Sequence, residues 1–245
     1  MPVFRFDLEQ GSADWYRIRS GIPTSSEFDQ VITPQTAKPS ASRYKYACRI
    51  IAGRLMNWQA DSLERVKHVE EGRLNEPLAI AQLEEIYQID TRPLGLVTTD
   101  DGRFGASPDR VANVAPDERS VGIVIEAKCP TIPIQMERLL LGDNDAYKCQ
   151  RQGHLFVADA DKALFVSYNP RMPIYQVENG RDEVFIQKLK AVLEQFSDEL
   201  EALSEKAKRL GIYQAFEELR VPAEAELAPE TMLEPAPEDV ARWLE

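Results

Sequence analysis

Cysteine and histidine are scarce in this chain of 245 residues, and their scarcity argues against several kinds of site. The three cysteines, Cys48, Cys129 and Cys149, form no Cys-x-x-Cys pair and are too few for a four-cysteine iron–sulfur cluster. We therefore expect free thiols in a reducing compartment. The two histidines, His68 and His154, are too isolated for a zinc site. His154 falls in a predicted helix, where a packing or surface role is expected rather than a ligand role.

Long apolar runs are also missing. No run approaches the roughly 18 uninterrupted apolar residues that predict a membrane helix, and residues 1–5 lack the apolar region of a signal peptide. We therefore expect a cytoplasmic protein without membrane contact. The length fits one domain with a helical elaboration, which we place at residues 1–220. Residues 221–245 are rich in Pro, Ala and Glu, and we expect them to form a flexible acidic tail.

The middle of the chain contains two acids and a lysine at an informative spacing. Asp109 follows a proline, and after a gap of sixteen residues come Glu126, Ala127 and Lys128, in the pattern Pro-Asp…(Asp/Glu)-x-Lys of metal-dependent nucleases. Residues 115–120 are turn-forming, so the flanking runs are predicted to pair as a hairpin. Residues i and i+2 of a strand share one face, so Glu126 and Lys128 project together. Asp109 on the neighbouring strand can meet them.

These residue types suit metal-assisted hydrolysis. Mg²⁺ takes oxygen ligands and keeps several waters, so one or two carboxylates and a substrate phosphate are sufficient. The bound ion activates water, and a nearby lysine can orient that water or stabilise developing charge. The alternative is a turn cap at Asp109 and a solvated strand face at Glu126 and Lys128. The apolar run 121–125 favours the nuclease interpretation, because it predicts a strand covered on both faces, where an ionised group needs a partner or a metal.

Further segments extend the pattern in a fixed order between about residue 11 and about residue 178. They are residues 15–27, 71–76, 105–109, 125–130, 147–152 and 168–172. Together they resemble the lambda-type exonucleases, also called the YqaJ-like viral recombinase family. The resemblance implies an α/β fold with a restriction-endonuclease-like core, in which helices flank a central mixed sheet and a long helix lies at the C-terminus. It also implies a phage- or prophage-encoded enzyme that works in the bacterial cytoplasm.

The same resemblance implies an activity and an assembly. The expected enzyme is a Mg²⁺-dependent exonuclease, with Mn²⁺ as an alternative ion, that degrades one strand of linear double-stranded DNA in the 5′-to-3′ direction. The product is a 3′ single-stranded overhang for phage recombination. The expected assembly is a ring-shaped homotrimer around DNA, with a phage single-strand annealing protein as a further partner.

Roles near the metal follow from the resemblance, residue by residue. Asp109 and Glu126 match the metal carboxylates, the backbone carbonyl of Ala127 a further ligand, and Lys128 the catalytic lysine. Glu76 matches a helical glutamate near the metal.

Four more residues match roles around the nucleophile and the phosphates. Gln152 matches a glutamine that orients the nucleophile, and Arg19 matches the arginine that receives the 5′-terminal phosphate. Ser26 and Ser107 match hydroxyl donors to phosphate. From the residues alone, each has a structural alternative: a surface arginine at Arg19, a helix N-cap at Ser26 and a solvated helical residue at Gln152.

Two positions depart from the family pattern. Arg110 stands where the family usually has glycine, so it either reshapes the turn after Asp109 or adds a phosphate contact. Pro77 directly follows Glu76 and cannot donate the hydrogen bond of a helix interior. Either the helix starts near Asn75, with Pro77 in its first turn, or it is kinked beside the metal site.

A deficit of positive charge is unexpected for a DNA enzyme, because phosphate neutralisation by Lys and Arg dominates nucleic-acid affinity. The net charge is −12, but residues 221–245, with seven acids and one arginine, account for −6 of it. The local field therefore matters more than the total.

Periodicity and turn signals predict the elements of an α/β core. Helices are expected at 44–58, 77–88, 133–141, 144–159 and 182–210, and strands near 94–98, 103–112, 121–128, 163–168 and 174–178. Two function classes compete with the exonuclease. A restriction-type endonuclease would share the metal cluster but gain nothing from a 5′-phosphate pocket. A non-catalytic DNA-binding assembly subunit could keep the fold, yet all the carboxylates and Lys128 are present.

Overall fold

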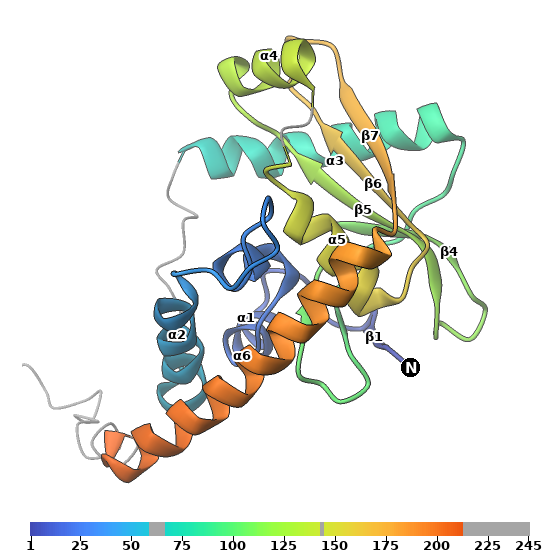
Figure 1. The fold of residues 1–245 in the computed structure, drawn as a ribbon. Helices are drawn as coiled ribbons and strands as arrows, with labels where there is room; N and C mark the ends of the chain where they lie inside the picture. The colour runs from blue at the N-terminus through green and yellow to red at the C-terminus, as the bar shows by residue number, and fades with distance from the viewer. Residues whose placement is uncertain (59–66, 143–144, 213–245) are drawn as a thin grey trace, which may run out of the picture.

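The computed structural model describes residues 1–58, 67–142 and 145–212, and Figure 1 shows their arrangement. The predicted tail at residues 221–245 lies outside the described residues. The elements, in chain order, are β1 (Val3–Arg5), α1 (Ala13–Ser20), the 3₁₀ helix η1 (Ser25–Gln30), α2 (Arg43–Met56), α3 (Lys67–Tyr87), β2 (Leu96–Thr98), β3 (Gly105–Ala106), β4 (Arg110–Val114), β5 (Val121–Lys128), α4 (Ile132–Leu141), α5 (Lys148–Ala158), β6 (Lys162–Ser167), β7 (Tyr175–Gly180) and α6 (Glu183–Arg209).

The central sheet is mixed, with strand order β4-β5-β6-β7. β4 and β5 form the predicted antiparallel hairpin, in which Val111 lies opposite Val124. β5 and β6 are parallel, and the connection between them carries α4 and α5, as a parallel pair requires. β7 closes the sheet antiparallel to β6. A smaller antiparallel sheet, β1-β2-β3, lies beside it. The predicted α/β class with a mixed sheet is confirmed.

Helices cover both faces of the central sheet, which explains the apolar run along β5. Val124 belongs to a cluster that includes Leu155 of α5 and Leu189 of α6. Its neighbours Ile123 and Ile125 belong to a second cluster that includes Ile80 and Leu83 of α3. Alternate side chains of one strand therefore enter different cores, and the end of β5 is buried on both sides.

The long C-terminal helix predicted at 182–210 is α6, which runs diagonally across the molecule and packs against α2 (Figure 1). Asp182 begins it as an N-cap, because its carboxylate accepts a hydrogen bond of 3.0 Å from the N–H of Phe185. The buried stripe includes Leu189, Phe196 and Leu200 at helical spacing. Val184, near the start of the helix, is exposed.

The predicted boundaries differ from the structure in two places near Asp109 and Glu76. The helix expected at 77–88 begins ten residues earlier, at Lys67, so that Pro77 lies inside α3 rather than in its first turn. The helix continues although Pro77 has no N–H to donate to residue 73. The strand expected at 103–112 is divided into β3 and β4, and residues 107–109 between them leave the ladder.

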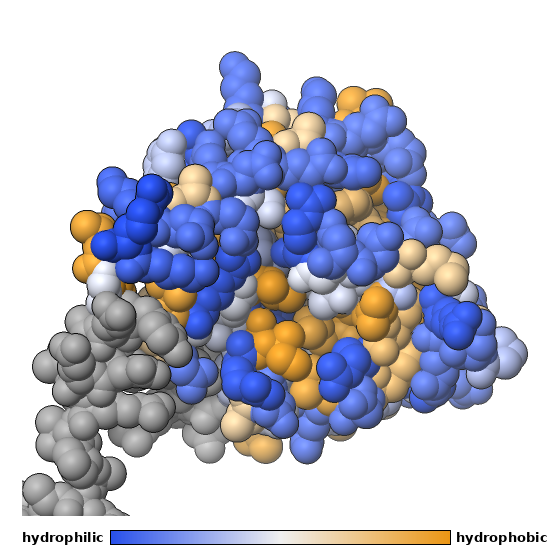
Figure 2. All heavy atoms as spheres, turned by 90° about the horizontal axis from the view of Figure 1, so that it is seen from below, coloured by the Kyte–Doolittle hydropathy of each residue, from blue (hydrophilic) through white to orange (hydrophobic). Residues whose placement is uncertain are grey.

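The surface is largely hydrophilic when the molecule is viewed from below, with an apolar area near the centre of that face (Figure 2). Within the part of the chain that the structure describes, no helix is both long and apolar enough to cross a membrane.

Candidate active site

The ends of the β4–β5 hairpin bring Asp109, Glu126 and Lys128 together. Asp109 directly precedes β4, and its Oδ2 accepts a hydrogen bond of 2.7 Å from the main-chain N–H of Ala127. This bond fixes a residue outside the strand ladder against the last residues of β5. Glu126 and Lys128 lie on one face of β5, as their spacing predicts, and the ammonium group of Lys128 donates to Oε1 of Glu126.

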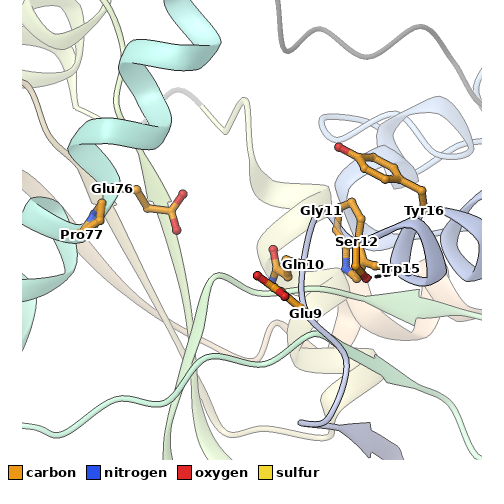
Figure 3. Close-up of a pocket in the computed structure, with 8 residues that line it drawn as sticks. All are labelled: Glu9, Gln10, Gly11, Ser12, Trp15, Tyr16, Glu76 and Pro77. Carbon is orange, nitrogen blue, oxygen red and sulfur yellow. Dashed lines mark hydrogen bonds between the residues drawn. The ribbon is translucent and has the colours of Figure 1, made fainter.

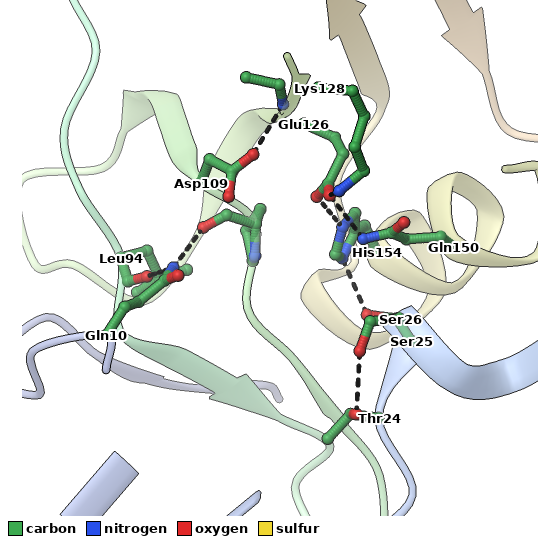
Figure 4. A network of polar contacts seen from close by, with 12 residues as sticks. Gln10, Thr24, Ser25, Ser26, Leu94, Asp109, Glu126, Lys128, Gln150 and His154 are labelled. Atoms are coloured by element: carbon green, nitrogen blue, oxygen red, sulfur yellow. Dashed lines mark hydrogen bonds and ion pairs between the residues drawn. The ribbon is translucent and has the colours of Figure 1, made fainter. Parts of the chain in front are cut away.

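Glu126 is buried, with 3% of its surface exposed, and its carboxylate is surrounded by donors (Figure 4). Nε2 of Gln150 donates to Oε1 over 2.6 Å, in addition to the contact from Lys128. On the other oxygen, Oε2, Nε2 of His154 lies 2.8 Å away. Both donors come from α5, the helix that covers this face of β5. A buried carboxylate needs such partners, because burial of an unpaired charge costs on the order of several kcal/mol.

The pKa values of the two carboxyl groups, half-buried Asp109 and buried Glu126, are shifted in opposite directions. Burial raises the pKa of Asp109 well above its usual value, and the charges of Glu126 and Glu76 raise it further. Burial also opposes ionisation of Glu126, but the charge of Lys128 and the bond to His154 outweigh it and lower its pKa to about 2. Burial lowers the pKa of Lys128, yet Glu126 and Asp109 raise it above its usual value, so the ammonium group stays charged.

Glu76 approaches the same region from α3. It lines a hollow of about 360 Å³ together with Asp109, Arg110 and Gln10. It also lines a second hollow of about 520 Å³ that reaches Trp15 on α1 (Figure 3). The carboxylates of Glu76 and Asp109 therefore line one hollow, and the second hollow leads from Glu76 towards α1.

Gln10 ties the N-terminal loop to the segment that carries Asp109. Its Nε2 donates to the carbonyl of Leu94 over 2.7 Å and to that of Pro108 over 2.9 Å. The residue before Asp109 is thus anchored from the N-terminal side, while Asp109 itself is anchored by Ala127. Figure 4 shows both connections.

The donor set fits a hard cation. Among residues 1–58, 67–142 and 145–212, no group of three or more His, Cys, Asp or Glu side chains has the arrangement of a complete metal site. Mg²⁺ needs fewer protein ligands than that, because it retains waters and uses substrate phosphate oxygens. Asp109 and Glu126 are two such oxygen donors, and the raised pKa of Asp109 reflects negative charge that a divalent cation would neutralise.

A second polar group forms where α1 meets η1. Arg19, near the end of α1, donates to Oγ of Ser26 over 2.9 Å. Its guanidinium lies over the ring of Trp15, 4.3 Å from the centroid. The indole N–H of Trp15 donates to the carbonyl of Gly95 over 2.8 Å and lies 3.3 Å from Oγ of Ser107. Trp15 therefore connects Arg19 and Ser26 to Ser107, two residues before Asp109.

Comparison with known proteins assigns the chain to a family. The sequence model of the YqaJ-like viral recombinase domain matches residues 14–161, which is more than half of the chain. The chain belongs to this family. No curated protein sequence matches it.

Solved structures agree with that assignment. An alkaline exonuclease (LHK-Exo) from Laribacter hongkongensis is 26% identical, with a TM-score of 0.70, and the match covers 83% of this chain and 100% of that one. LHK-Exo in complex with dAMP matches with a TM-score of 0.71, 26% identity and the same coverage. A phage-related exonuclease from Haemophilus somnus 129PT is 16% identical, with a TM-score of 0.54 and coverage of 74% and 95%, and shows the fold alone.

One residue expected at the active site of this YqaJ-family protein lies elsewhere. Nε2 of Gln152 donates to the carbonyl of Gly180 over 3.0 Å, and its Oε1 accepts from the N–H of Asp182 over 2.9 Å. The structure thus uses Gln152 to join α5 to the β7–α6 connection and does not bring it to Glu126. The reason is helical phase: residues two apart on a helix point roughly 200° apart.

Two residues that contact Glu126 were not predicted from the sequence. Gln150 and His154 are four residues apart, so they share the face of α5 that is turned to β5. Of the two roles expected for His154, the surface role is wrong, because the residue is buried, and beyond packing it contacts a carboxylate of the site. The i, i+4 spacing of a glutamine and a histidine was the available signal, but it does not indicate which helix face meets the sheet.

Proposed function

We propose that this YqaJ-family chain is a Mg²⁺-dependent 5′-to-3′ exonuclease that degrades one strand of linear double-stranded DNA and leaves a 3′ overhang. The observation that carries the proposal is the cluster of buried Glu126 with half-buried Asp109 and Lys128, beside a hollow shared with Glu76. The likeness to LHK-Exo, an alkaline exonuclease crystallised with dAMP, supports a nucleotide-containing substrate.

In this proposal, Asp109, Glu126 and the carbonyl of Ala127 hold the Mg²⁺ ion, with Glu76 near it. The ion supplies water activation and neutralises charge on the phosphate under attack. Lys128 is held charged beside Glu126, so its ammonium group stabilises developing negative charge.

We assign the nucleophile-orienting role to Gln150 in place of Gln152. The Nε2 of Gln150 is already hydrogen-bonded within the carboxylate cluster, whereas both polar atoms of Gln152 are engaged at the β7–α6 connection.

The polarity of digestion is assigned to Arg19, which receives the 5′-terminal phosphate. Arginine suits this task because its planar fork makes paired, charge-assisted bonds to phosphate oxygens. The contact with Ser26 and the stacking on Trp15 hold the guanidinium in place, and Ser107 adds a hydroxyl between this pocket and Asp109.

For the assembly, we propose a homotrimeric ring around DNA, with a phage single-strand annealing protein as partner of the overhang. An acidic protein gains little from charge attraction to DNA alone. A closed ring retains the duplex by its topology, which makes a net charge of −12 compatible with repeated cleavage.

The test is incubation of the protein with matched linear and closed circular duplex DNA, with Mg²⁺ and with EDTA. We expect Mg²⁺-dependent release of nucleotides from linear DNA only, starting at 5′ ends when each end is labelled separately. Cleavage of closed circles would indicate an endonuclease instead. Absence of any Mg²⁺- or Mn²⁺-dependent hydrolysis, with DNA binding retained, would indicate a non-catalytic assembly subunit.

A further inference from the structure

Both ring nitrogens of His154 are engaged by side chains of the site region. Only 1% of its surface is exposed. Its Nε2 lies 2.8 Å from Oε2 of Glu126, and its Nδ1 lies 3.0 Å from Oγ of Ser25 on η1. The chain Ser25–His154–Glu126 thus runs from the N-terminal region, through α5, to the end of β5 (Figure 4).

The two oxygens of Glu126 are in different situations. Oε1 accepts from Lys128 and Gln150, whose side chains are half-buried. Among the described residues, the hydrogen-bond partner of Oε2 is His154, whose ring is buried and contacts Ser25 of η1 and Glu126 of β5. When a cation arrives, Oε1 can exchange a partner, whereas Oε2 cannot do so without the displacement of a buried ring.

We propose that His154, oriented by Ser25, is a positioning residue that holds Oε2 of Glu126 and leaves Oε1 as the only oxygen of this carboxylate available to the metal ion. The inference rests on the proposed metal-dependent function. It assigns Glu126 a single-oxygen contact, which favours Mg²⁺ over Ca²⁺, because Ca²⁺ readily takes carboxylates through both oxygens and Mg²⁺ is bound through few, well-placed ones.

Hydrogen-bond capacities make the orientation definite. A carboxylate only accepts, so the ring nitrogen that faces Glu126 has to carry a proton. The hydroxyl of Ser25 can donate to Nδ1 or accept from it, so it anchors the other side of the ring in either case. Without Ser25, the buried Nδ1 loses its partner and the ring loses one of its two anchors.

The close packing of α5 on η1 makes the contact between His154 and Ser25 possible. Gly153, next to His154, lets the helix approach η1 closely: a Cβ at that position would lie 2.6 Å from Cδ2 of Phe28 and 3.0 Å from Cβ of Ser25. Phe28 is completely buried and cannot yield. The close approach brings Ser25, itself only 1% exposed, within reach of Nδ1.

The experiment measures metal binding without DNA. Mn²⁺ binding to the full chain is followed by electron paramagnetic resonance of free Mn²⁺, and bound Mn²⁺ is then displaced with Mg²⁺ or Ca²⁺. His154→Phe keeps the ring size but removes both nitrogens, and we expect it to weaken Mg²⁺ binding by about 10- to 100-fold and to raise the ratio of Ca²⁺ to Mg²⁺ affinity. His154→Gln restores a donor to Oε2 and should recover most of both quantities. Ser25→Ala should give a smaller loss in the same direction.

Cys149→Ala is the matched control, because Cys149 is buried on the same helix and its thiol contacts the carbonyl of Ile32 rather than the site. It should leave both metal affinities unchanged. If His154→Phe does not fold, His154→Gln and Ser25→Ala decide the question through the Ca²⁺ to Mg²⁺ ratio.

Two failures are distinguishable. The positioning role is overturned if folded His154→Phe keeps the wild-type Mg²⁺ affinity and the wild-type ion preference. If His154→Phe does not fold, the same result for folded Ser25→Ala overturns it. Either result leaves the nuclease proposal intact. A wild-type protein that binds Mn²⁺ with the expected preference but never hydrolyses linear DNA overturns the proposed function and leaves the binding argument standing.

Discussion

At the scale of single residues, the carboxylates of Asp109, which is half-buried, and Glu126, which is buried, have very different surroundings. Glu126 is met by three side-chain donors, whereas Asp109 is given one main-chain N–H by Ala127. Donors and positive charges lower a carboxyl pKa, while burial and nearby carboxylates raise it. The pKa of Glu126 therefore falls despite burial, and that of Asp109 rises. Such opposite tuning of neighbouring groups is characteristic of functional sites.

Lys128 is predicted to act on the chemical step rather than on the metal. Lys128→Ala should lower kcat on linear duplex DNA by about 100-fold or more, because a fixed charge at the reacting phosphate is lost, while Mn²⁺ binding remains. Asp109→Ala should remove both the hydrolysis of linear duplex DNA and the binding of Mn²⁺. Lys162→Ala, which alters a half-exposed lysine paired with Glu178, serves as the matched control. Near-normal turnover of Lys128→Ala would remove this residue from the mechanism.

Substitution of Gln150 should affect activity, whereas substitution of Gln152 should affect stability. Gln150→Ala removes a donor to Glu126 and should reduce kcat while the midpoint of urea unfolding changes little. Gln152→Ala removes two bonds at the β7–α6 connection and should cost about 1–3 kcal/mol of unfolding free energy, with kcat nearly unchanged. The opposite pattern, with activity lost only in Gln152→Ala, would restore the sequence-based assignment.

Arg19 is expected to set the preference for 5′-phosphorylated ends. Wild-type protein should degrade a 5′-phosphate duplex faster than a 5′-hydroxyl duplex, and Arg19→Ala should reduce that preference more than it reduces Mn²⁺ binding. Arg17→Ala is the matched control, because Arg17 lies on the same helix but pairs with Asp14 at the surface. Equal wild-type rates on the two ends would contradict the assignment.

The sequence predicts the residues whose positions depend on strand geometry, and misses those that depend on helical phase. Glu126 and Lys128 share a face because every second strand residue does so. On α5, the chain offers glutamines at both 150 and 152, and only the packing of that helix on β5 selects Gln150. His154 was passed over for the same reason, although its burial follows once the helix face is known.

At the scale of elements, the site depends on close contacts between α5 and η1 and between α1 and α2. Gly53 on α2 lies against the backbone of α1, where a Cβ would come within 2.4 Å of the carbonyl oxygen of Ser20. This contact places the end of α1, and with it Arg19. Neither contact is visible in the sequence, because a glycine inside a helix pattern only lowers the expected helix propensity. The unpredicted first half of α3 has a similar cause: Pro77 suggests a helix start, whereas the helix continues through it.

Gly153→Ala tests the α5–η1 contact. The added methyl group would clash with the buried ring of Phe28, so we expect a loss of about 1–3 kcal/mol in unfolding free energy together with reduced nuclease activity. Gly180→Ala is the control, since nothing lies within 4 Å of its added Cβ. Chemical denaturation and nucleotide release are measured on both variants. Unchanged stability and activity in Gly153→Ala would show that the contact is not tight in solution.

At the scale of the whole molecule, the fold can be predicted from the sequence pattern, whereas the net charge is not what DNA binding would predict. The mixed sheet with helices on both faces follows from apolar strands and amphipathic helices, which is why the sequence predicts it. The charge does not follow from function in the same way: a net charge of −12 opposes non-specific attraction to DNA. Basic groups can therefore attract phosphate only where the chain places them together, as it places Arg19 and Lys128 near the carboxylates. The proposed nuclease then needs a second means of retaining DNA.

Assembly into a closed ring is the predicted means, and it can be measured directly. Heterologous contacts between identical subunits close into a ring when the rotation between them permits, and a ring around duplex DNA cannot leave it by lateral diffusion. We expect sedimentation equilibrium at micromolar concentration to give about three times the 27.8 kDa of one chain. With excess unlabelled competitor DNA added after initiation, the ring should continue on its first substrate. High salt should weaken initial loading more than continued digestion, because phosphate contacts are screened while topology is not. A mass of about 28 kDa, with digestion that resists the competitor, would refute the ring, because retention would then require no closed assembly.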